Sequence, residues 1–176
     1  LKVTGELTGD DFRFIRDEMP ELRHLNLRGI KTKNVILYHS WVGNEWGGND
    51  YLPRYMDNAI PEEAFARNKN IRSIILPSSV THIGTDAFRE CQLMYSTLEI
   101  PEGVTYIGGG AFIYNDYNGM TLVLPNSLDS IGGNVINHCN WECELNLSDN
   151  IKYIGGSVQA EGSPHFRGTF HVPSHL

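Results

Sequence analysis

The sequence predicts a solenoid of short parallel β-strands with turns of about 24 residues, and three observations carry this prediction. The stretches SSVTHIGTDAF and EGVTYIGGGAF begin 24 residues apart, at Ser78 and Glu102. Two weaker copies, beginning at Asn126 and Asp149, continue the period. A short stretch of alternating apolar residues precedes each copy. A repeat of this length is typical of solenoids, in which each turn buries its apolar face against the next.

Residues 1–21 are predicted to form a strand followed by a helix. The segment LKVTGEL alternates as a strand does. The segment TGDDFRFIRDEMP begins with helix-capping residues and places Phe12, Ile15 and Met19 at helical spacing. Pro20 then ends the helix. A solenoid must cover its open ends, so we expect residues 1–21 to be an N-terminal cap.

Residues 22–70 are predicted to hold the first repeat, interrupted by an insertion over residues 34–59. The part from 35 to 55 carries aromatic residues among glycines and asparagines, and the pattern predicts no structure of its own for it. Two interpretations stay open: the rings pack over the edge of the solenoid, or they bind a protein or a sugar. The candidate binding residues here are Trp41, Trp46, Tyr51 and Tyr55.

Residues 71–176 are predicted to form about four and a half regular repeats, so that the chain is a single domain. Prolines follow most of the strand segments and end them, because proline donates no ladder hydrogen bond. Strands one repeat apart should lie about 4.8 Å apart in one continuous parallel sheet. The six predicted strand centres are Leu25, Ile74, Leu98, Leu122, Leu145 and Phe170.

The second half of each repeat supplies columns of core residues. Valine or another aliphatic residue, an Ile-Gly pair and an Ala-Phe pair recur there in order. A further column holds Asn68, Cys91, Asn115 and Cys139, which we expect to be buried. Cys91 and Cys139 would stand about 10 Å apart, too far for a disulfide, which needs Cα atoms within about 7 Å. A bond between Cys139 and Cys143 stays open.

The segment from Ile71 to Cys91 resembles the Treponema-type leucine-rich repeat of the BspA-like bacterial surface proteins. The resemblance covers residues 60–173 and reaches back more loosely to Leu22; it fades in the fourth full repeat, where Ser148 replaces the proline. It implies a right-handed leucine-rich repeat solenoid with its strands on the concave face. It also implies a secreted or surface-anchored, outer membrane-associated bacterial protein, with adhesion or protein binding, including host extracellular proteins, as its role.

The outward positions of the strands are the second group of candidate binding residues. Their mildly polar and β-branched side chains fit strand propensity, and they also fit a protein partner recognised by shape. The formal charge of −7 argues against nucleic acid, and the chain has no run of 18 apolar residues that would enter a membrane. These candidates are Ile75, Glu99, Val123, Asn146 and His171.

The sequence offers no catalytic, cofactor or metal motif. Phosphate-binding and nucleophile-elbow patterns are absent. The cysteines 139 and 143 and the histidines 171 and 175 have zinc-finger spacing, but 27 residues separate the two pairs, against about 12–15 in the usual finger. The sequence therefore predicts a non-catalytic protein-interaction or adhesion module without cofactor or metal. The alternative is a carbohydrate-binding module that uses the insertion.

Overall fold

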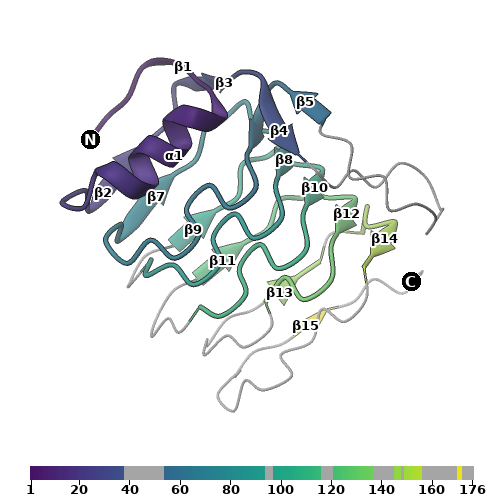
Figure 1. Ribbon diagram of the computed structural model, residues 1–176. Coiled ribbons are helices and arrows are strands. Elements are labelled where there is room, and N and C mark those ends of the chain that lie inside the picture. The colour runs from purple at the N-terminus through teal and green to yellow at the C-terminus, as the bar shows by residue number, and fades with distance from the viewer. Residues whose placement is uncertain are drawn as a thin grey trace.

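The computed structural model describes residues 1–37, 54–93, 97–115, 121–136, 145–147, 149–155 and 170–171, which form a parallel β-solenoid of about five turns (Figure 1). The predicted solenoid is thereby confirmed. The elements are, in chain order, β1 (Gly5–Leu7), α1 (Gly9–Glu18), β2 (His24–Asn26), β3 (Ile30–Thr32), β4 (Val35–Leu37), β5 (Arg54–Met56), β6 (Ala59–Ile60), β7 (Ser73–Ile75), β8 (His82–Ile83), β9 (Thr97–Glu99), β10 (Tyr106–Ile107), β11 (Thr121–Val123), β12 (Ser130–Ile131), β13 (Leu145–Asn146), β14 (Tyr153–Ile154) and β15 (Phe170–His171).

The most regular part of the molecule is a sheet that the sequence pattern did not predict. Five parallel strands, β6, β8, β10, β12 and β14, run side by side in this order (Figure 1), and we call them the Ile–Gly sheet. Ile83 pairs in register with Ile60 and Ile107, and all three side chains are fully buried. The sequence predicted only that the chain turns back at these positions.

A glycine follows the inward-facing isoleucine in four of these five strands, and the reason is steric. A Cβ atom on Gly84 would lie 2.6 Å from the backbone nitrogen of Glu62, and one on Gly108 would lie 2.5 Å from that of Thr85. Backbone atoms cannot move aside as a flexible side chain can. The close approach places the Gly108 N–H 2.8 Å from the carbonyl oxygen of Ile83, to which it donates. Glycine therefore lets each turn hydrogen-bond to the one before it.

The strands on the other half of each turn, which we call the strand face, lie at all six predicted centres. They are hydrogen-bonded as three pairs, however: β2 with β7, β9 with β11, and β13 with β15. The prediction of one continuous sheet is therefore wrong for the described residues, although β7 lies next to β9. Each ladder is two or three residues long, and Pro77, Pro101 and Pro125 remove the donors that would extend it.

The core between the two halves is built from the predicted columns. The rings of Phe65 and Phe88 stack with centroids 5.3 Å apart, and Phe88 and Phe112 stack at the same distance. The ring of Phe12 from α1 meets Phe65 edge-on at 5.7 Å. All four rings are buried, so the aromatic column continues from the turns into the helix.

The predicted strand and helix within residues 1–21 are present, and α1 lies across the first turns (Figure 1). The Asp11 carboxylate accepts hydrogen bonds from the N–H and O–H of Thr8, which fixes the start of the helix and lowers the pKa of Asp11. Arg16 donates to the carbonyl oxygen of Glu63 at 2.7 Å, and Asn68 donates to that of Arg16. These bonds tie the helix to the first turn. Its role as a cap stays a prediction.

The insertion has structure at both of its ends, which corrects the expectation that it has none. Strands β4 and β5 pair antiparallel, with Ile36 opposite Tyr55. Val35 and Leu37 pack on Ala59 of β6, and all three are buried. At its base Lys33 donates to Asp57 at 2.7 Å. The hairpin therefore covers the outside of the first strand of the Ile–Gly sheet.

Candidate functional site

The first candidate surface is the strand strip, formed by the outward residues of the strand face that the sequence singled out. Ile75 and Val123 are 40% and 44% exposed, and Glu99 is exposed between them. Their neighbours Ile74, Leu98 and Leu122 point into the core, so alternation along each strand fixes the outward direction. Asn146 and His171 lie in β13 and β15; the orientation of their side chains falls outside the description. The strand strip carries apolar side chains and one carboxylate.

At its N-terminal end the strand face is bordered by the first residues of the chain. Asn26 donates its backbone N–H to the carbonyl oxygen of Leu1 at 2.9 Å, and Val3 donates to that of Asn26 at 3.2 Å. On the face itself, Nδ1 of His24 lies 2.8 Å from Oγ of Ser73. Residues 1–3 therefore occupy the edge of β2, and a partner must use the face of these strands and not that edge.

The second candidate surface is the insertion, of which the structure describes only part. Tyr55 lies in β5 and is 68% exposed. It stands beside the half-buried Ile36, on the side of the hairpin opposite the residues that pack on Ala59. Trp41, Trp46 and Tyr51 lie outside the described residues. Tyr55 is the predicted binding residue of the insertion that can be placed, and it is available for contact.

The Asn and Cys column is structural. Asn68, Cys91 and Asn115 are buried as predicted, whereas Cys139 lies outside the described residues. The Asn115 side chain accepts from the N–H of Cys91 at 2.7 Å and donates to the carbonyl oxygens of Phe88 and Phe112. Burial raises the pKa of the Cys91 thiol to about 12, which leaves almost no thiolate at neutral pH and makes the thiol inert. These side chains form hydrogen bonds with backbone groups of the turns and are buried, so we do not assign them to a ligand site.

A third surface was missed by the sequence reasoning. The residue before each Ile-Gly pair faces outward from the Ile–Gly sheet, since the isoleucine faces inward. His82, Tyr106, Ser130 and Tyr153 align there in register, and we call them the outer column. The rings of His82 and Tyr106 lie with centroids 5.8 Å apart. An aromatic residue at three of four successive repeat positions was visible in the sequence, but the segment was not recognised as a strand.

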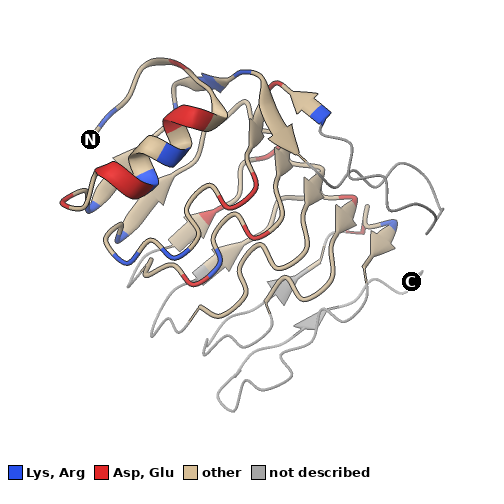
Figure 2. Ribbon diagram, viewed as in Figure 1, with Lys and Arg blue, Asp and Glu red and all other residues tan. Residues whose placement is uncertain are grey.

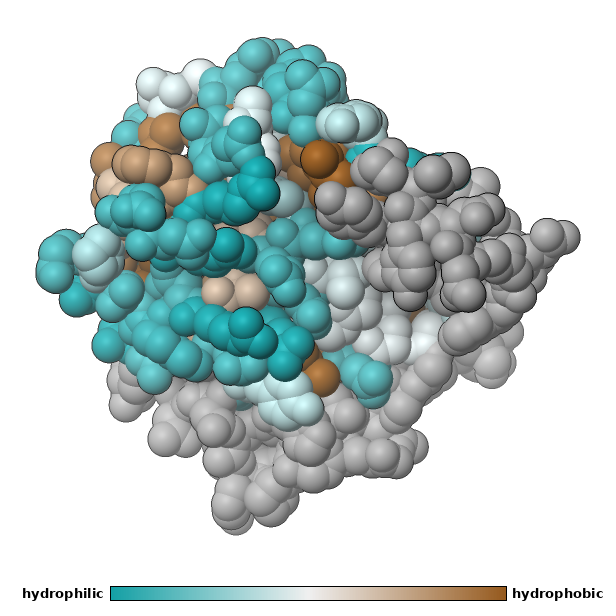
Figure 3. Space-filling model, in the orientation of Figure 1, coloured by the Kyte–Doolittle hydropathy of each residue, from teal (hydrophilic) through white to brown (hydrophobic). Residues whose placement is uncertain are grey.

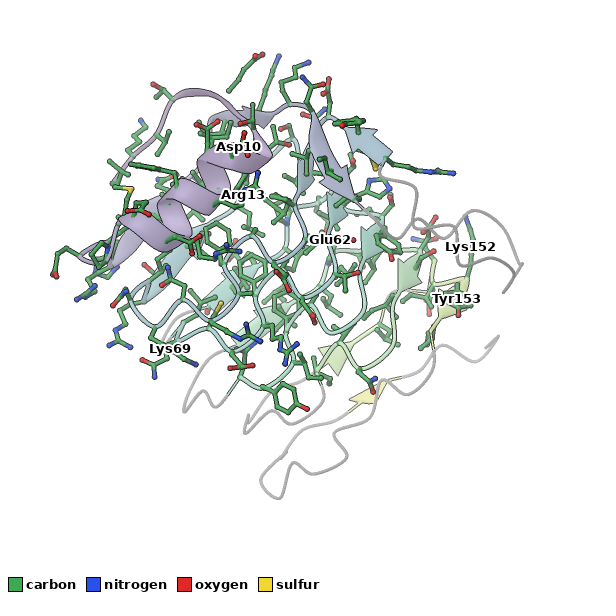
Figure 4. All side chains as sticks on the ribbon, viewed as in Figure 1. Asp10, Arg13, Glu62, Lys69, Lys152 and Tyr153 are labelled. Carbon is green, nitrogen blue, oxygen red and sulfur yellow. The ribbon has the colours of Figure 1, made fainter. Side chains whose placement is uncertain are left out.

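Burial affects the titration of the outer column. It lowers the pKa of His82, and the nearby Asp129 opposes this only in part. Burial also raises the pKa of Tyr106 to about 12, with smaller contributions from Glu62 and Tyr153. Both rings are therefore uncharged at neutral pH. Figure 4 labels Glu62 and also Tyr153, the last member of the outer column.

A polar cavity of about 380 Å³ lies between α1 and the first turn. Arg16 binds both carboxylate oxygens of Asp17, at 2.7 and 2.8 Å, which lowers the pKa of Asp17. Lys69 donates to the carbonyl oxygen of Glu90. Figure 2 shows charges of both signs on α1 and the adjoining turns, and Figure 3 shows that this face is mainly hydrophilic. Arg16 joins the helix to the first turn through Glu63, and Lys69 joins that turn to the next one, so we assign the cavity a structural role.

Among the described residues, no group of three or more His, Cys, Asp or Glu side chains could hold a metal ion. The four residues with zinc-like spacing include 139, 143 and 175, which lie outside the description. In the part of the chain that the structure describes, no helix has the length and apolar character needed to cross a membrane.

Comparison with known proteins returned one informative match. A family model described as BspA type leucine rich repeat region matches residues 58–163, in six copies. The matched segment includes β6 to β14, and so all of the Ile–Gly sheet. A search of curated proteins returned no match.

Proposed function

The chain belongs to the family of BspA-type leucine-rich repeats, and we propose from this premise that it is a non-catalytic adhesion module of a secreted or cell-surface bacterial protein. Leucine-rich repeats generally bind proteins, and proteins with this type of repeat are typically secreted or on the bacterial surface. The finer role in adhesion to a host extracellular protein is our proposal. The resemblance of Ile71 to Cys91 to BspA-like repeats supports it.

The strand strip is the observation that carries the proposal. Ile75 and Val123 expose apolar side chains to solvent, and they are not part of the buried core. Such side chains become desolvated in an interface and contribute binding free energy. The strip has a single acidic group among the described residues, so recognition would depend on shape more than on charge.

The test is a binding screen of the chain against a panel of purified extracellular-matrix and plasma proteins by biolayer interferometry. For a protein that binds, Ile75→Arg and Val123→Arg should each weaken the affinity about tenfold or more, since a charge would have to be desolvated in the interface. Phe14→Arg is the matched control, because Phe14 is an exposed apolar residue on α1, 59% exposed. Equal affinities for all three variants would reject the strand strip as the site.

A second candidate function is carbohydrate binding through the insertion, which the 68% exposure of Tyr55 favours. Amphipathic rings on an exposed hairpin suit contact with sugars as well as with proteins. A glycan array with wild-type chain and with the Trp41→Ala/Trp46→Ala double variant tests it. Glycan binding that the double variant loses, at an unchanged thermal midpoint, would support this function. A large fall in the midpoint with intact binding would show that the rings only cover the solenoid edge.

A further inference from the structure

The outer column is a continuous surface on a different face from the strand strip. His82, Tyr106, Ser130 and Tyr153 come from four successive strands of the Ile–Gly sheet. Neighbouring strands lie about 4.8 Å apart, so the column presents one side chain at each such step. His82, Tyr106 and Tyr153 are half-buried and retain exposed area. The unbroken ladder beneath them holds these positions in fixed register.

One position on this outward face of the Ile–Gly sheet is covered by apolar residues of the chain itself, and it shows which kind of side chain an internal contact requires. The first position of the same row is Ala59, which is fully buried under Val35 and Leu37 of the hairpin. A small apolar residue is what such a contact requires. The next positions are a histidine, two tyrosines and a serine, which combine flat apolar rings with hydrogen-bonding groups. The outer column therefore has the composition of a surface in contact with a polar ligand or water, and not that of an internal contact.

Charge narrows the class of ligand. Asp129 accepts a hydrogen bond from Oγ of Ser130 at 2.8 Å and forms an ion pair with Lys152 at 3.5 Å, so its charge is balanced within the chain. Figure 2 shows the strands β8, β10 and β12 free of charged residues. The whole chain has a formal charge of −7, which repels polyanions. Glu62 lies near enough to Tyr106 to contribute to its raised pKa, which further disfavours an anionic ligand. The surface fits a neutral ligand that has many hydrogen-bonding groups.

We propose that the outer column binds a neutral, linear polysaccharide that lies across the turns of the solenoid. Sugar rings have apolar C–H faces that pack on His82, Tyr106 and Tyr153, and hydroxyl groups that bond to Ser130 and to the polar ends of the rings. A linear chain fits because the column itself is linear and regular. This inference does not rest on the strand strip, which lies on another face, so the two can fail independently.

The test is isothermal titration of the full chain with neutral hexasaccharides of glucose in β-1,4, β-1,3 and α-1,4 linkage, and with those of mannose and N-acetylglucosamine. Polygalacturonic acid serves as the acidic comparison. At least one neutral hexasaccharide should bind, and the acidic polymer should bind more weakly. Loss of one stacked ring should weaken binding roughly tenfold, by analogy with nucleic-acid bases that stack on aromatic side chains.

The variants separate stacking from general destabilisation. His82→Ala and Tyr106→Ala should each weaken binding, whereas Tyr106→Phe should retain most of it because the ring remains. Ser130→Tyr adds a ring between Tyr106 and Tyr153 and should strengthen binding, which a damaged fold would not do. Tyr114→Ala is the matched control, because Tyr114 is a tyrosine of the same turn, 43% exposed and covered by Arg89; it should change nothing.

Three results would overturn the inference. One is the absence of binding by every neutral hexasaccharide. Another is binding that the Trp41→Ala/Trp46→Ala double variant removes and Tyr106→Ala does not, which would assign the sugar to the insertion. The third is a protein partner whose affinity falls in Tyr106→Ala and Tyr106→Phe but not in Val123→Arg, since the outer column would then be a protein interface.

Discussion

The Ile–Gly sheet and the strand face come from the same turns of the chain, yet they are joined differently. Five strands of the first are hydrogen-bonded without a break, whereas the strands of the second form three separate pairs within the described part of the chain. The difference begins with glycine. Gly84 and Gly108 allow the backbone of the neighbouring turn to approach within a distance that a Cβ atom would block. After the strands of the strand face the chain has residues with side chains instead of glycine. Most of these strands are followed closely by a proline, which cannot donate a hydrogen bond to extend the ladder.

This difference suggests that one half of each turn provides stability and the other half provides a binding surface. A continuous ladder with buried isoleucines and stacked phenylalanines behind it should hold the turns together. The inward residues of the strand face also belong to the core, but its outward residues Ile75, Glu99 and Val123 do not and can change without loss of the fold. Stability and binding by the strand strip would then reside in different halves of each turn.

The largest expected effect is that of Phe88→Ala. Phe88 is fully buried and stacks on Phe65 and Phe112 at 5.3 Å. Its removal should lower the free energy of unfolding by about 3–5 kcal/mol, through lost burial and the cavity left behind. Val123→Ala on the strand strip should change it by less than about 0.5 kcal/mol. Urea denaturation followed by circular dichroism measures both free energies of unfolding. Equal losses in the two variants would contradict the proposal that the core provides stability and the strand strip does not.

Replacement of Gly108 by alanine should lower the free energy of unfolding by about 3 kcal/mol, because the turn must move away from Thr85. Gly29→Ala is the matched control. A Cβ atom there meets nothing within 4 Å, and the backbone is not in the left-handed region. Its effect should stay within about 0.5 kcal/mol. A tolerated Gly108→Ala would show that close approach is not what holds the sheet together.

Asn115→Ala should cost about 2 kcal/mol, since it removes three hydrogen bonds to buried backbone: one from the Cys91 N–H and two to the carbonyl oxygens of Phe88 and Phe112. Asn150→Ala removes a hydrogen bond to the carbonyl oxygen of Asn126 at an exposed position, and its effect should be under about 1 kcal/mol. Thermal denaturation of both variants checks this. Similar shifts in midpoint would mean that the buried Asn and Cys column is dispensable.

The smallest expected effect is a pH dependence from His82. Its pKa is lowered in the folded chain, so the unfolded chain binds the proton more readily. Stability from this group is therefore fully present above the ordinary histidine pKa of about 6.5 and is lost as the pH falls below it. The slope of stability against pH between about 5 and 7 should be smaller in His82→Gln. An unchanged slope would show that burial of this ring does not matter.

Much of this architecture was predictable, because each structural position of the repeat occurs several times in the sequence. The spacing of Ile83 and Ile107, the alternation around Ile74 and the Ala-Phe pairs each pointed to the same turn. The Ile–Gly sheet was missed because its strands are two residues long, too short for alternation to show. The hairpin of the insertion was missed because its strands, at Val35 and Arg54, lie far apart in sequence. Pairing across such a gap depends on tertiary packing against Ala59.

The candidate site was predicted only in part. Ile75 and Val123 were placed correctly on the outside of the strands, because alternation alone determines this. The exposure of Tyr55 depends on which side of the hairpin packs on β6, which no local pattern specifies. The outer column required the register of the Ile–Gly sheet. The sequence showed its aromatic residues but not that they share a face.

Native-state hydrogen exchange measured by NMR tests this difference between the two halves of each turn most directly. The amides of Gly108 and Gly132 donate to the preceding turn at 2.8 Å, and those of Leu27 and Ile100 donate across the strand face at 2.9 Å. Although the bonds are nearly equal in length, the two glycine amides should exchange only through global unfolding. Leu27 and Ile100 should exchange at least about tenfold faster through local opening. Equal or greater protection of Leu27 and Ile100 would contradict the claim that the Ile–Gly sheet holds the solenoid together.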